Sequence, residues 1–481
     1  MSAALFSALS LPTLGQAFGL RASTGDFMTL PVSTPQRRLP LARRAGLALA
    51  LLLAAAAAQA ALPIQHWTQP SGARVALVES PAIPMLDVQI DFDAGSRRDP
   101  ARQAGLASVS ALMSARGVQA HGSAPALDEN ALSEAWADLG ASFGGSASSD
   151  RLTFGLRTLT EPDLLDRAVA LAARQLAEPA LPEAVWRRER ERLVASLKEE
   201  DTRPGTQAAK AFARAVYGDH PYGYEMSAAT LATIQVSDLR SYLKRSVRAC
   251  DARVSLVGAV NREQADALVT RLLALLPAGP CQPQPAVPEV APLAQAETLS
   301  LPFDSAQAHV FIGQPGIRRA DPDYFALLVG NYILGGGGFV SRLTSEVREK
   351  RGLSYSVYSY FAPGLHAGAF TVGLQTRPDP AAQAVQVSRD VIARFVAEGP
   401  TEAELRAAKD NLIGGFALRI DSNKKLLGNV ANIAWNDLPL DYLAQWAKKV
   451  EALTVADVRT AMAQKLQPDR MVTVVVGGKQ P

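Results

Sequence analysis

Alternating apolar and polar positions along the chain predict a repeated order of strands and helices. Short apolar or alternating runs are typical of strands, whereas an apolar position every three or four residues is typical of a helix. The predicted strands cover residues 73–79, 86–92, 152–158, 254–257 and 472–476. An apolar helix is expected over about residues 103–115. A long amphipathic helix is expected over about 182–200, with the charged run Arg187 to Arg192, including Glu189, on its solvated side.

The chain contains two related halves. Three separate stretches match later stretches at nearly the same offset, about 220 residues, which is far too long for a solenoid repeat. The aligned residues are Arg98 with Arg319, Thr153 with Thr371, and Gly258 with Gly477. Because the strands return as hairpins, an α+β fold is favoured. We expect two homologous domains of about 200 residues, each a mainly antiparallel sheet covered by helices on one face.

The N-terminus is typical of a secretory signal. Arg43 and Arg44 precede an apolar run that ends at a small-residue site, so cleavage is expected after Ala60 and the mature protein should be periplasmic or secreted. An uncleaved N-terminal anchor is the alternative and would be the only link to a membrane. Translation from Met28 instead of Met1 would leave a signal of ordinary length. The expected organisation is a signal region at 1–60, an N-terminal domain at 61–276, a Pro-rich linker at 277–295 and a C-terminal domain at 296–481.

Composition excludes several classes of protein. Of 481 residues, 48% are hydrophobic and 20% charged, which excludes disorder and coiled coil, and a net charge of +3 provides no field for a nucleic-acid partner. The two cysteines, Cys250 and Cys281, are too few for a thiolate zinc site; they could pair or remain free thiols. The five histidines are His66, His121, His220, His309 and His366.

Sequence motifs of a self-sufficient hydrolase are missing. No two histidines lie within ten residues of each other, so no helical His-x-x-x-His pair exists, and there is no Gly-x-Ser-x-Gly. His220, in the stretch Gly218 to Tyr222, is expected to stabilise a turn. A zinc site built from scattered side chains stays open only as a remote alternative.

The order of elements and the stretch Gly105 to Met113 resemble the pitrilysin/insulinase family of peptidases over essentially all of the mature chain. Active members carry His-x-x-Glu-His here, in which two histidines bind zinc and the glutamate is the general base. In this chain Ser108 and Leu112 replace the histidines and Ala111 the glutamate. The family's third ligand would fall near Glu189 or Ser196, but one carboxylate alone makes no zinc site. The resemblance therefore implies that this chain binds no metal.

The second half keeps a different part of the family's site. Four glycines, Gly335, Gly336, Gly337 and Gly338, allow close approach to a bound peptide. The resemblance then matches Arg348 and Tyr355, seven residues apart, to a pair that faces the zinc centre and can hold a peptide carbonyl. Arg351 is a possible substitute for Arg348. The alternative is that Arg348 is a solvated helix charge and Tyr355 an ordinary strand aromatic.

The resemblance extends to mitochondrial-type processing peptidases, which pair an H-x-x-E-H subunit with one that lacks it. This chain looks like the second kind: it would supply Arg348 and Tyr355 to a homologous zinc-bearing partner and bind extended peptides by adding a strand to a sheet edge. The rival is a scaffold or binding protein without a proteolytic role. An autonomous hydrolase with an unrecognised site is a third possibility.

Overall fold

The computed structural model describes residues 63–277, 279–281 and 283–477. The expected signal region at 1–60 and the choice between Met1 and Met28 lie outside the described residues. The strands are β1 (Gln65–Thr68), β2 (Arg74–Glu79), β3 (Met85–Phe92), β4 (Ser142–Ala147), β5 (Leu152–Leu159), β6 (Arg253–Gly258), β7 (Glu297–Leu301), β8 (Ala308–Ile317), β9 (Ser356–Phe361), β10 (Gly368–Thr376) and β11 (Val472–Val476).

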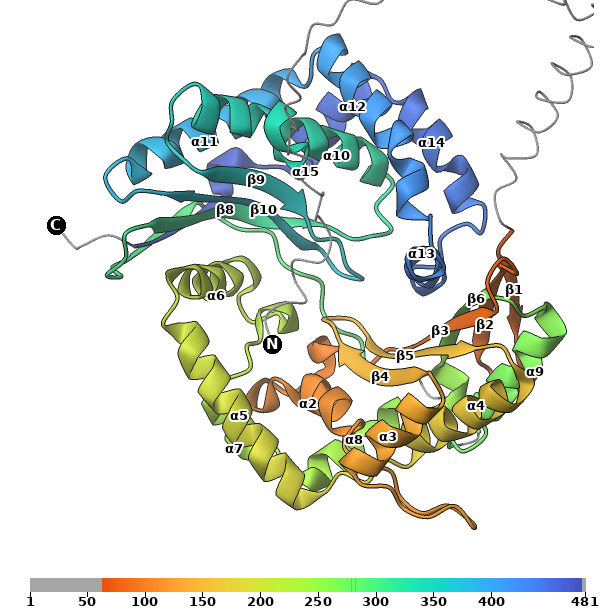
Figure 1. Cartoon of the computed structure of the whole chain (residues 1–481). Helices are drawn as coiled ribbons and strands as arrows, with labels where there is room; N and C mark the ends of the chain where they lie inside the picture. Colours follow the sequence, from red (N-terminus) through yellow and green to blue (C-terminus); the bar gives the residue numbers. More distant parts are fainter. Residues whose placement is uncertain (1–62, 278, 282, 478–481) are drawn as a thin grey trace, which may run out of the picture. The chain divides into compact units, whose positions relative to one another are not determined.

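The helices alternate with these strands in the same order in both halves (Figure 1). In the first half they are α2 (Leu106–Met113), α3 (Glu129–Asp138), α4 (Pro162–Ala177), α5 (Glu183–Asp201), α6 (Pro204–Tyr217), α7 (Ala228–Thr233), α8 (Val236–Ser246) and α9 (Arg262–Leu273). In the second half they are α10 (Tyr324–Asn331), α11 (Ala381–Glu398), α12 (Glu402–Gly414), α13 (Asn423–Trp435), α14 (Tyr442–Ala452) and α15 (Val455–Lys465).

Each half contains one mixed but mainly antiparallel sheet. The first sheet has the order β1-β2-β6-β3-β5-β4, and the second has the order β7-β11-β8-β10-β9. Among the paired strands of the described residues, β2–β6 and β11–β7 are parallel and the other pairs are antiparallel. The last five strands of the first sheet therefore correspond one by one to the second, which confirms the α+β fold and the duplication. All five predicted strands are confirmed, as β2, β3, β5, β6 and β11.

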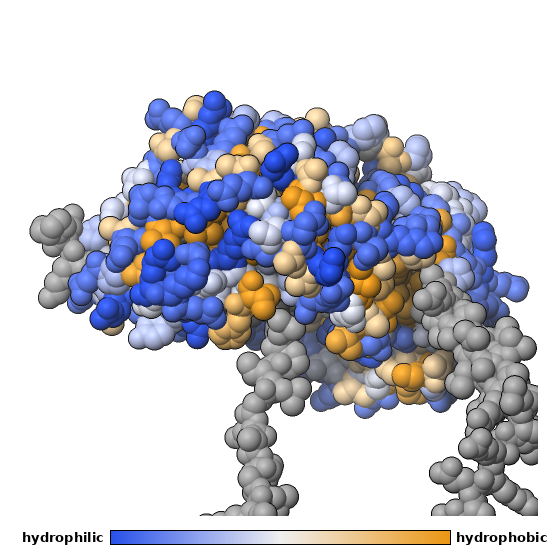
Figure 2. Space-filling view, turned by 90° about the horizontal axis from the view of Figure 1, so that it is seen from above, coloured by the Kyte–Doolittle hydropathy of each residue, from blue (hydrophilic) through white to orange (hydrophobic). Residues whose placement is uncertain are grey.

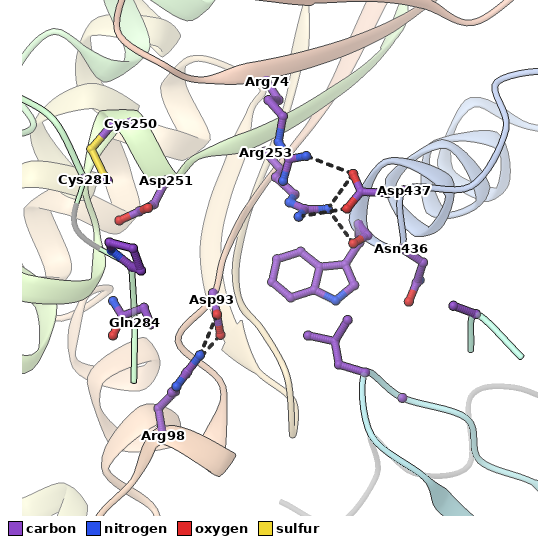
Figure 3. Close-up of a pocket in the computed structure, with 15 residues that line it drawn as sticks. Arg74, Asp93, Arg98, Cys250, Asp251, Arg253, Cys281, Gln284, Asn436 and Asp437 are labelled. Atoms are coloured by element: carbon purple, nitrogen blue, oxygen red, sulfur yellow. Dashed lines mark hydrogen bonds and ion pairs between the residues drawn. A yellow bond between two sulfur atoms is a disulfide. The ribbon is translucent and has the colours of Figure 1, made fainter. Parts of the chain in front are cut away.

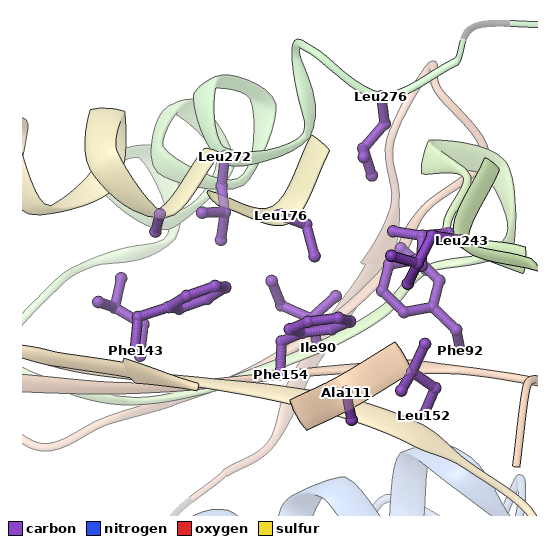
Figure 4. Close-up of a cluster of buried hydrophobic side chains, with 14 of the residues drawn as sticks. Ile90, Phe92, Ala111, Phe143, Leu152, Phe154, Leu176, Leu243, Leu272 and Leu276 are labelled. Carbon is purple, nitrogen blue, oxygen red and sulfur yellow. The ribbon is translucent and has the colours of Figure 1, made fainter. Parts of the chain in front are cut away.

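Aromatic side chains fill the core of the first half between its sheet and its own helices (Figure 4). Phe154 of β5 meets Phe92 edge to face at 6.2 Å between ring centroids, and stacks on Phe143 of β4 at 5.9 Å. Phe143 in turn stacks on Trp136 of α3 at 5.8 Å. Such pairs add to the stabilisation that burial of their apolar area already provides.

One helix of each half packs against the sheet of the other half. Alternate residues of β2 point to opposite faces: Leu77 joins the core of the first half, whereas Ala76 and Val78 join a cluster with α13 of the second half. Reciprocally, α6 packs Phe212 against Phe311 of the second sheet, with 5.7 Å between the ring centroids. Both sheets are thus covered on two faces, not on one face as we expected (Figure 1).

The connection between the halves is anchored by a disulfide. Cys250 and Cys281 are bonded, with 5.7 Å between their Cα atoms (Figure 3). Of the two alternatives expected for the cysteines, a disulfide or two free thiols, the structure has the disulfide. The described residues between Leu276 and Glu297 contain no helix or strand, and Val290 is buried among them.

The described residues contain no helix that is long and apolar enough to cross a membrane. The face seen in Figure 2 carries its apolar side chains in separate patches among hydrophilic ones.

Candidate functional site

Helix α2 starts from a tightly built turn. Gly105 precedes it with φ of 104°, a value that a residue with a Cβ adopts only with strain. The buried carboxylate of Asp99 accepts hydrogen bonds from the amides of Gly105 (2.9 Å) and Ala107 (3.0 Å), which satisfies free donors at the helix start. Burial nevertheless dominates and raises the pKa of Asp99 to about 7.

The side chains that replace the expected zinc motif lie on this helix. Ser108 and Leu112 are half-buried and one turn apart, and Ala111 is buried, with its carbonyl accepting from Ser114 Oγ at 2.7 Å. A hydroxyl, a methyl and an isobutyl group offer neither an imidazole ligand nor a general base. The donor set therefore does not fit zinc.

Glu189 of α5 is buried, with 3% of its surface exposed, so our placement of it on the solvated side of the helix was wrong. Three guanidinium groups compensate its charge: Arg192 at 2.8 Å, Arg188 at 2.9 Å, and Arg116, which follows α2, at 3.4 Å. A buried carboxylate requires such partners because desolvation penalises its charged form. Ser196, the other candidate for the third ligand, is half-buried about two helix turns further on.

The described residues bring together one group of three metal-type side chains, Cys250, Asp251 and Cys281. Both sulfurs belong to the disulfide, so Asp251 is the one side chain of these three that can still bind a cation. Glu189 is not in any such group.

The glycine-rich segment packs against the outer edge of β9. Gly335 ends up beside Ser359, where an added Cβ would lie 2.6 Å from the backbone nitrogen of Ser359 and 2.8 Å from Leu343 Cδ1. Asn331 Nδ2 donates to the carbonyl of Ser359 at 3.1 Å and so covers the same edge. Gly336 and Gly337 are also crowded, by Asn331 and Tyr332, whereas Gly338, with φ of +64°, has open space around it. Close packing therefore explains three of the four glycines.

Arg348 and Tyr355 follow this segment: Arg348 is half-buried, whereas Tyr355 is exposed. Arg348 lies in a π-helical stretch, Thr344–Glu349, and its guanidinium rests 4.8 Å from the ring centre of Phe339. Tyr355 precedes β9 and is 69% exposed. Within the part of the chain that the structure describes, neither the guanidinium nor the phenol has a hydrogen-bond or ion-pair partner. Arg351, by contrast, is paired with Glu346 at 2.6 Å.

Two exposed apolar side chains, one of them in contact with Arg348, come shortly before this pair in the chain. Phe339 is 67% exposed and Val340 76% exposed, next to one another in the chain. Large apolar side chains this exposed and close together are typical of interaction sites.

Strand β4 ends the first sheet and has a free outer edge. It pairs with β5 on one side, and no hydrogen bond to its other side is found among residues 63–277, 279–281 and 283–477. The equivalent strand β9 is covered by Gly335 and Asn331, so the two halves differ at this point. Our sequence reasoning missed β4, whose residues Ser-Phe-Gly-Gly-Ser-Ala lack a strand-like apolar pattern.

Comparison with known proteins agrees with this geometry. Residues 74–230 match the model of the insulinase family, peptidase family M16, and residues 233–412 match that of the peptidase M16 inactive domain. The chain is similar to a crystal structure of the peptidase M16 inactive domain from Pseudomonas fluorescens, with 34% identity and a TM-score of 0.81. That match covers 87% of this chain and 100% of the other.

Two curated relatives carry opposite descriptions. An uncharacterized zinc protease of Streptomyces coelicolor is 28% identical over 286 residues, which span 57% of this chain and 61% of that protein. The non-peptidase homolog YmxG of Helicobacter pylori is 24% identical over 415 residues, or 84% of this chain and 91% of that protein. Together with the replacements at Ser108, Ala111 and Leu112, these matches show that the chain belongs to the M16 peptidase family, as an inactive pitrilysin-like member.

Proposed function

We propose that this protein is the non-zinc-binding subunit of a heteromeric zinc metallopeptidase. One observation carries the proposal: within the described chain the Arg348 guanidinium and the Tyr355 phenol have no hydrogen-bond or ion-pair partner, and Arg348 lies against the exposed ring of Phe339, which Val340 follows. Unsatisfied polar groups beside exposed apolar side chains suit a surface that a partner completes. The partner is a homologous chain with an intact H-x-x-E-H motif, and it supplies the zinc.

The chemistry of the pair matches the task of completing a peptidase site. A guanidinium donates two parallel hydrogen bonds and a phenol donates one, so together they can hold a peptide carbonyl oxygen and stabilise the negative charge that develops on it. A zinc ion held by the partner would polarise the same carbonyl. This chain contributes binding and charge stabilisation, and no proton transfer.

Extended peptides would bind at the free edge of β4. An added strand satisfies the unpaired backbone groups there, and the exposed face of β4 consists of Ser142, Gly144 and Ser146, which leave room for the side chains of a peptide. The corresponding edge of β9 is occupied by the glycine-rich segment. Of the two equivalent sheet edges, the one at β4 is therefore available to a peptide.

An extracytoplasmic location fits both the expected signal region and the Cys250–Cys281 disulfide, since such bonds persist in oxidising compartments. We therefore place the mature protein in the periplasm or outside the cell.

A scaffold without a proteolytic role is the second candidate. The observation that favours it is the packing of Gly335, Gly336 and Gly337 against their neighbours, because these glycines then have a structural role and do not require a peptide ligand. The two candidates differ in whether Arg348 and Tyr355 affect catalysis.

The test is peptide hydrolysis by the mature chain mixed with a coexpressed homologue that carries H-x-x-E-H. We expect no cleavage by either chain alone, and activity on mixing that falls at least tenfold with Arg348→Ala and with Tyr355→Phe, since one lost charge-stabilising donor costs that much or more. Arg351→Ala is the matched control, because Arg351 already pairs with Glu346, and it should keep the activity. Equal cleavage by normally formed complexes of all three variants would exclude a catalytic role for Arg348 and Tyr355, and complexes that form without any cleavage would favour the scaffold.

A further inference from the structure

A cluster of titratable side chains joins the two halves at the linker. Two equivalent hairpin loops meet there: the β4–β5 turn, with Asp150, and the β9–β10 loop, residues 362–367. Asp150 accepts from Arg97 Nε (2.9 Å) and Tyr222 OH (2.7 Å) of its own half and from the amide of Leu365 (2.9 Å) of the other. The Tyr222 oxygen accepts in turn from the amide of His366 at 3.2 Å.

The linker is fastened at the same place. His220 Nε2 donates to the carbonyl of Pro288 at 2.9 Å, while the Glu289 carboxylate accepts from the amide of Ala367 at 2.8 Å. A segment without helix or strand is thus tied to the first half by an imidazole and to the second by a carboxylate.

The hydrogen bonds of His220 require its neutral form. The carbonyl of Pro288 can only accept, so Nε2 carries the proton; the amide of Tyr222 donates to Nδ1 at 3.1 Å, so Nδ1 must be free of one. A second proton on the ring would face the Tyr222 amide donor and abolish that bond. His220 is 7% exposed, so water does not replace the lost partner without movement of the loop.

His366 increases this sensitivity. Its ring centre lies 5.3 Å from that of His220, and its buried Nδ1 has no hydrogen bond but lies 3.5 Å from Glu289 Oε2. A charge on His366 at this distance lowers the pKa of His220. A charge on both rings would place two cations next to each other, with 5.3 Å between the ring centres.

The other groups around His220 do not offset the added charge. They are Arg97 from the turn after β3, Asp150 from the β4–β5 turn, Tyr217 from α6, Tyr222, Glu289, and Arg318 at the end of β8. Arg97 already pairs with Asp150, and Arg318 lies 3.9 Å from Glu289, so the cluster is neutral when both imidazoles are neutral.

We infer that this junction is an acid-sensitive clasp: neutral His220 holds the linker and the β9–β10 loop on the first half, and protonation of His220 beside His366 releases both. The environment of His220 supports release in acid. Burial lowers the pKa of His220 below its usual 6.5, although the hydrogen bond to Pro288 opposes this effect. A depressed pKa means that the unfolded or released form binds the proton more tightly. The stabilisation is therefore full above about pH 6.5 and is lost as the pH falls through the lowered pKa.

Amide hydrogen exchange of the mature chain at pH 7.5 and 5.0, corrected for intrinsic rates, tests the clasp. The amides of Tyr222, Leu365, His366 and Ala367 should lose at least tenfold in protection at pH 5.0, while amides of β3 and β5 keep theirs. Unchanged protection of the loop at pH 5.0 would overturn the inference.

Variants assign the response to the histidines. His220→Gln keeps a donor and an acceptor but cannot titrate, so the loop should stay protected at both pH values; equal loss of protection at pH 5.0 would mean that other groups respond. The His220→Gln variant could already lack protection of the loop amides at pH 7.5, and His366→Gln then provides the test. Removing the charge beside His220 should shift the release of the loop to lower pH. An unchanged pH of release would contradict the inference. His66→Gln, at an exposed position on β1, is the matched control and should behave like the parent.

Discussion

At the scale of single residues, the glycines of the tetraglycine segment differ in why an alanine would be unfavourable. Gly335→Ala would force a methyl group against the backbone of Ser359, so we expect a loss of about 1–3 kcal/mol in the free energy of unfolding, as for other overpacked sites. Gly338→Ala meets no neighbour and should lose about 1 kcal/mol, because its φ is positive. Urea unfolding checks both values.

Gly428 is the control for these substitutions. It is exposed in the middle of α13 with no atom near a prospective Cβ, so Gly428→Ala should stabilise the chain by about 0.5–1 kcal/mol through helix propensity. If Gly335→Ala were as harmless to stability as Gly428→Ala but weakened peptide binding, the packing explanation for the segment would fail, and a binding role would take its place.

The role of a single residue could be predicted where a sequence motif determines it. It was harder to predict where the role depends on burial in the fold. The replacements at Ser108, Ala111 and Leu112 can be read from the sequence, because ligand chemistry depends on residue type alone. Glu189 stands in a run of six charges, and nothing in the run shows which one faces inward. One of its three guanidinium partners, Arg116, is 73 positions away and reaches it only in the folded chain.

At the scale of elements, the exchange of α6 and α13 makes each sheet depend on a helix from the other half. Phe212 of α6 is 6% exposed and packs on Phe311, so Phe212→Ala should cost about 3–5 kcal/mol, the usual range for a buried aromatic. Hydrogen exchange should then rise first in β8 and β11, which belong to the other half of the sequence. Arg214→Ala, at an exposed position of the same helix, should change neither the stability nor the hydrogen exchange of β8 and β11. Faster hydrogen exchange confined to the first sheet after Phe212→Ala would argue against the packing of α6 on the second sheet.

Amphipathic patterns predicted the existence of these helices but could not assign their partners. Apolar positions show that a helix has a face to bury, whereas the surface it buries against is a property of the fold. The same limit applies to the strands: β2, β3, β5, β6 and β11 were predicted from apolar runs, and β4 was missed because two glycines and two serines interrupt its pattern. Its strand character comes from pairing with β5.

At the scale of the whole molecule, the helix exchange predicts that neither half is stable alone. A fragment of residues 63–281 would expose Ala76, Val78 and Val257, which α13 covers in the intact chain, and a fragment of 283–477 would expose the face of β11 that α6 covers. Uncovered apolar faces of this kind drive aggregation or association. We therefore expect each fragment to lack a cooperative unfolding transition, and the two together, coexpressed, to form a complex that unfolds in one step.

Coexpression with a copy of 63–281 that carries Phe212→Asp provides the control, since a charge in place of that ring cannot be buried against Phe311 and should prevent the complex. Calorimetry and size-exclusion chromatography measure both results. A first-half fragment that unfolds cooperatively by itself, at the same urea concentration as the intact chain, would show that α13 adds little to its sheet. The two halves would then be independent domains, and the clasp at His220 would be their main connection instead of a reinforcement of an already shared core.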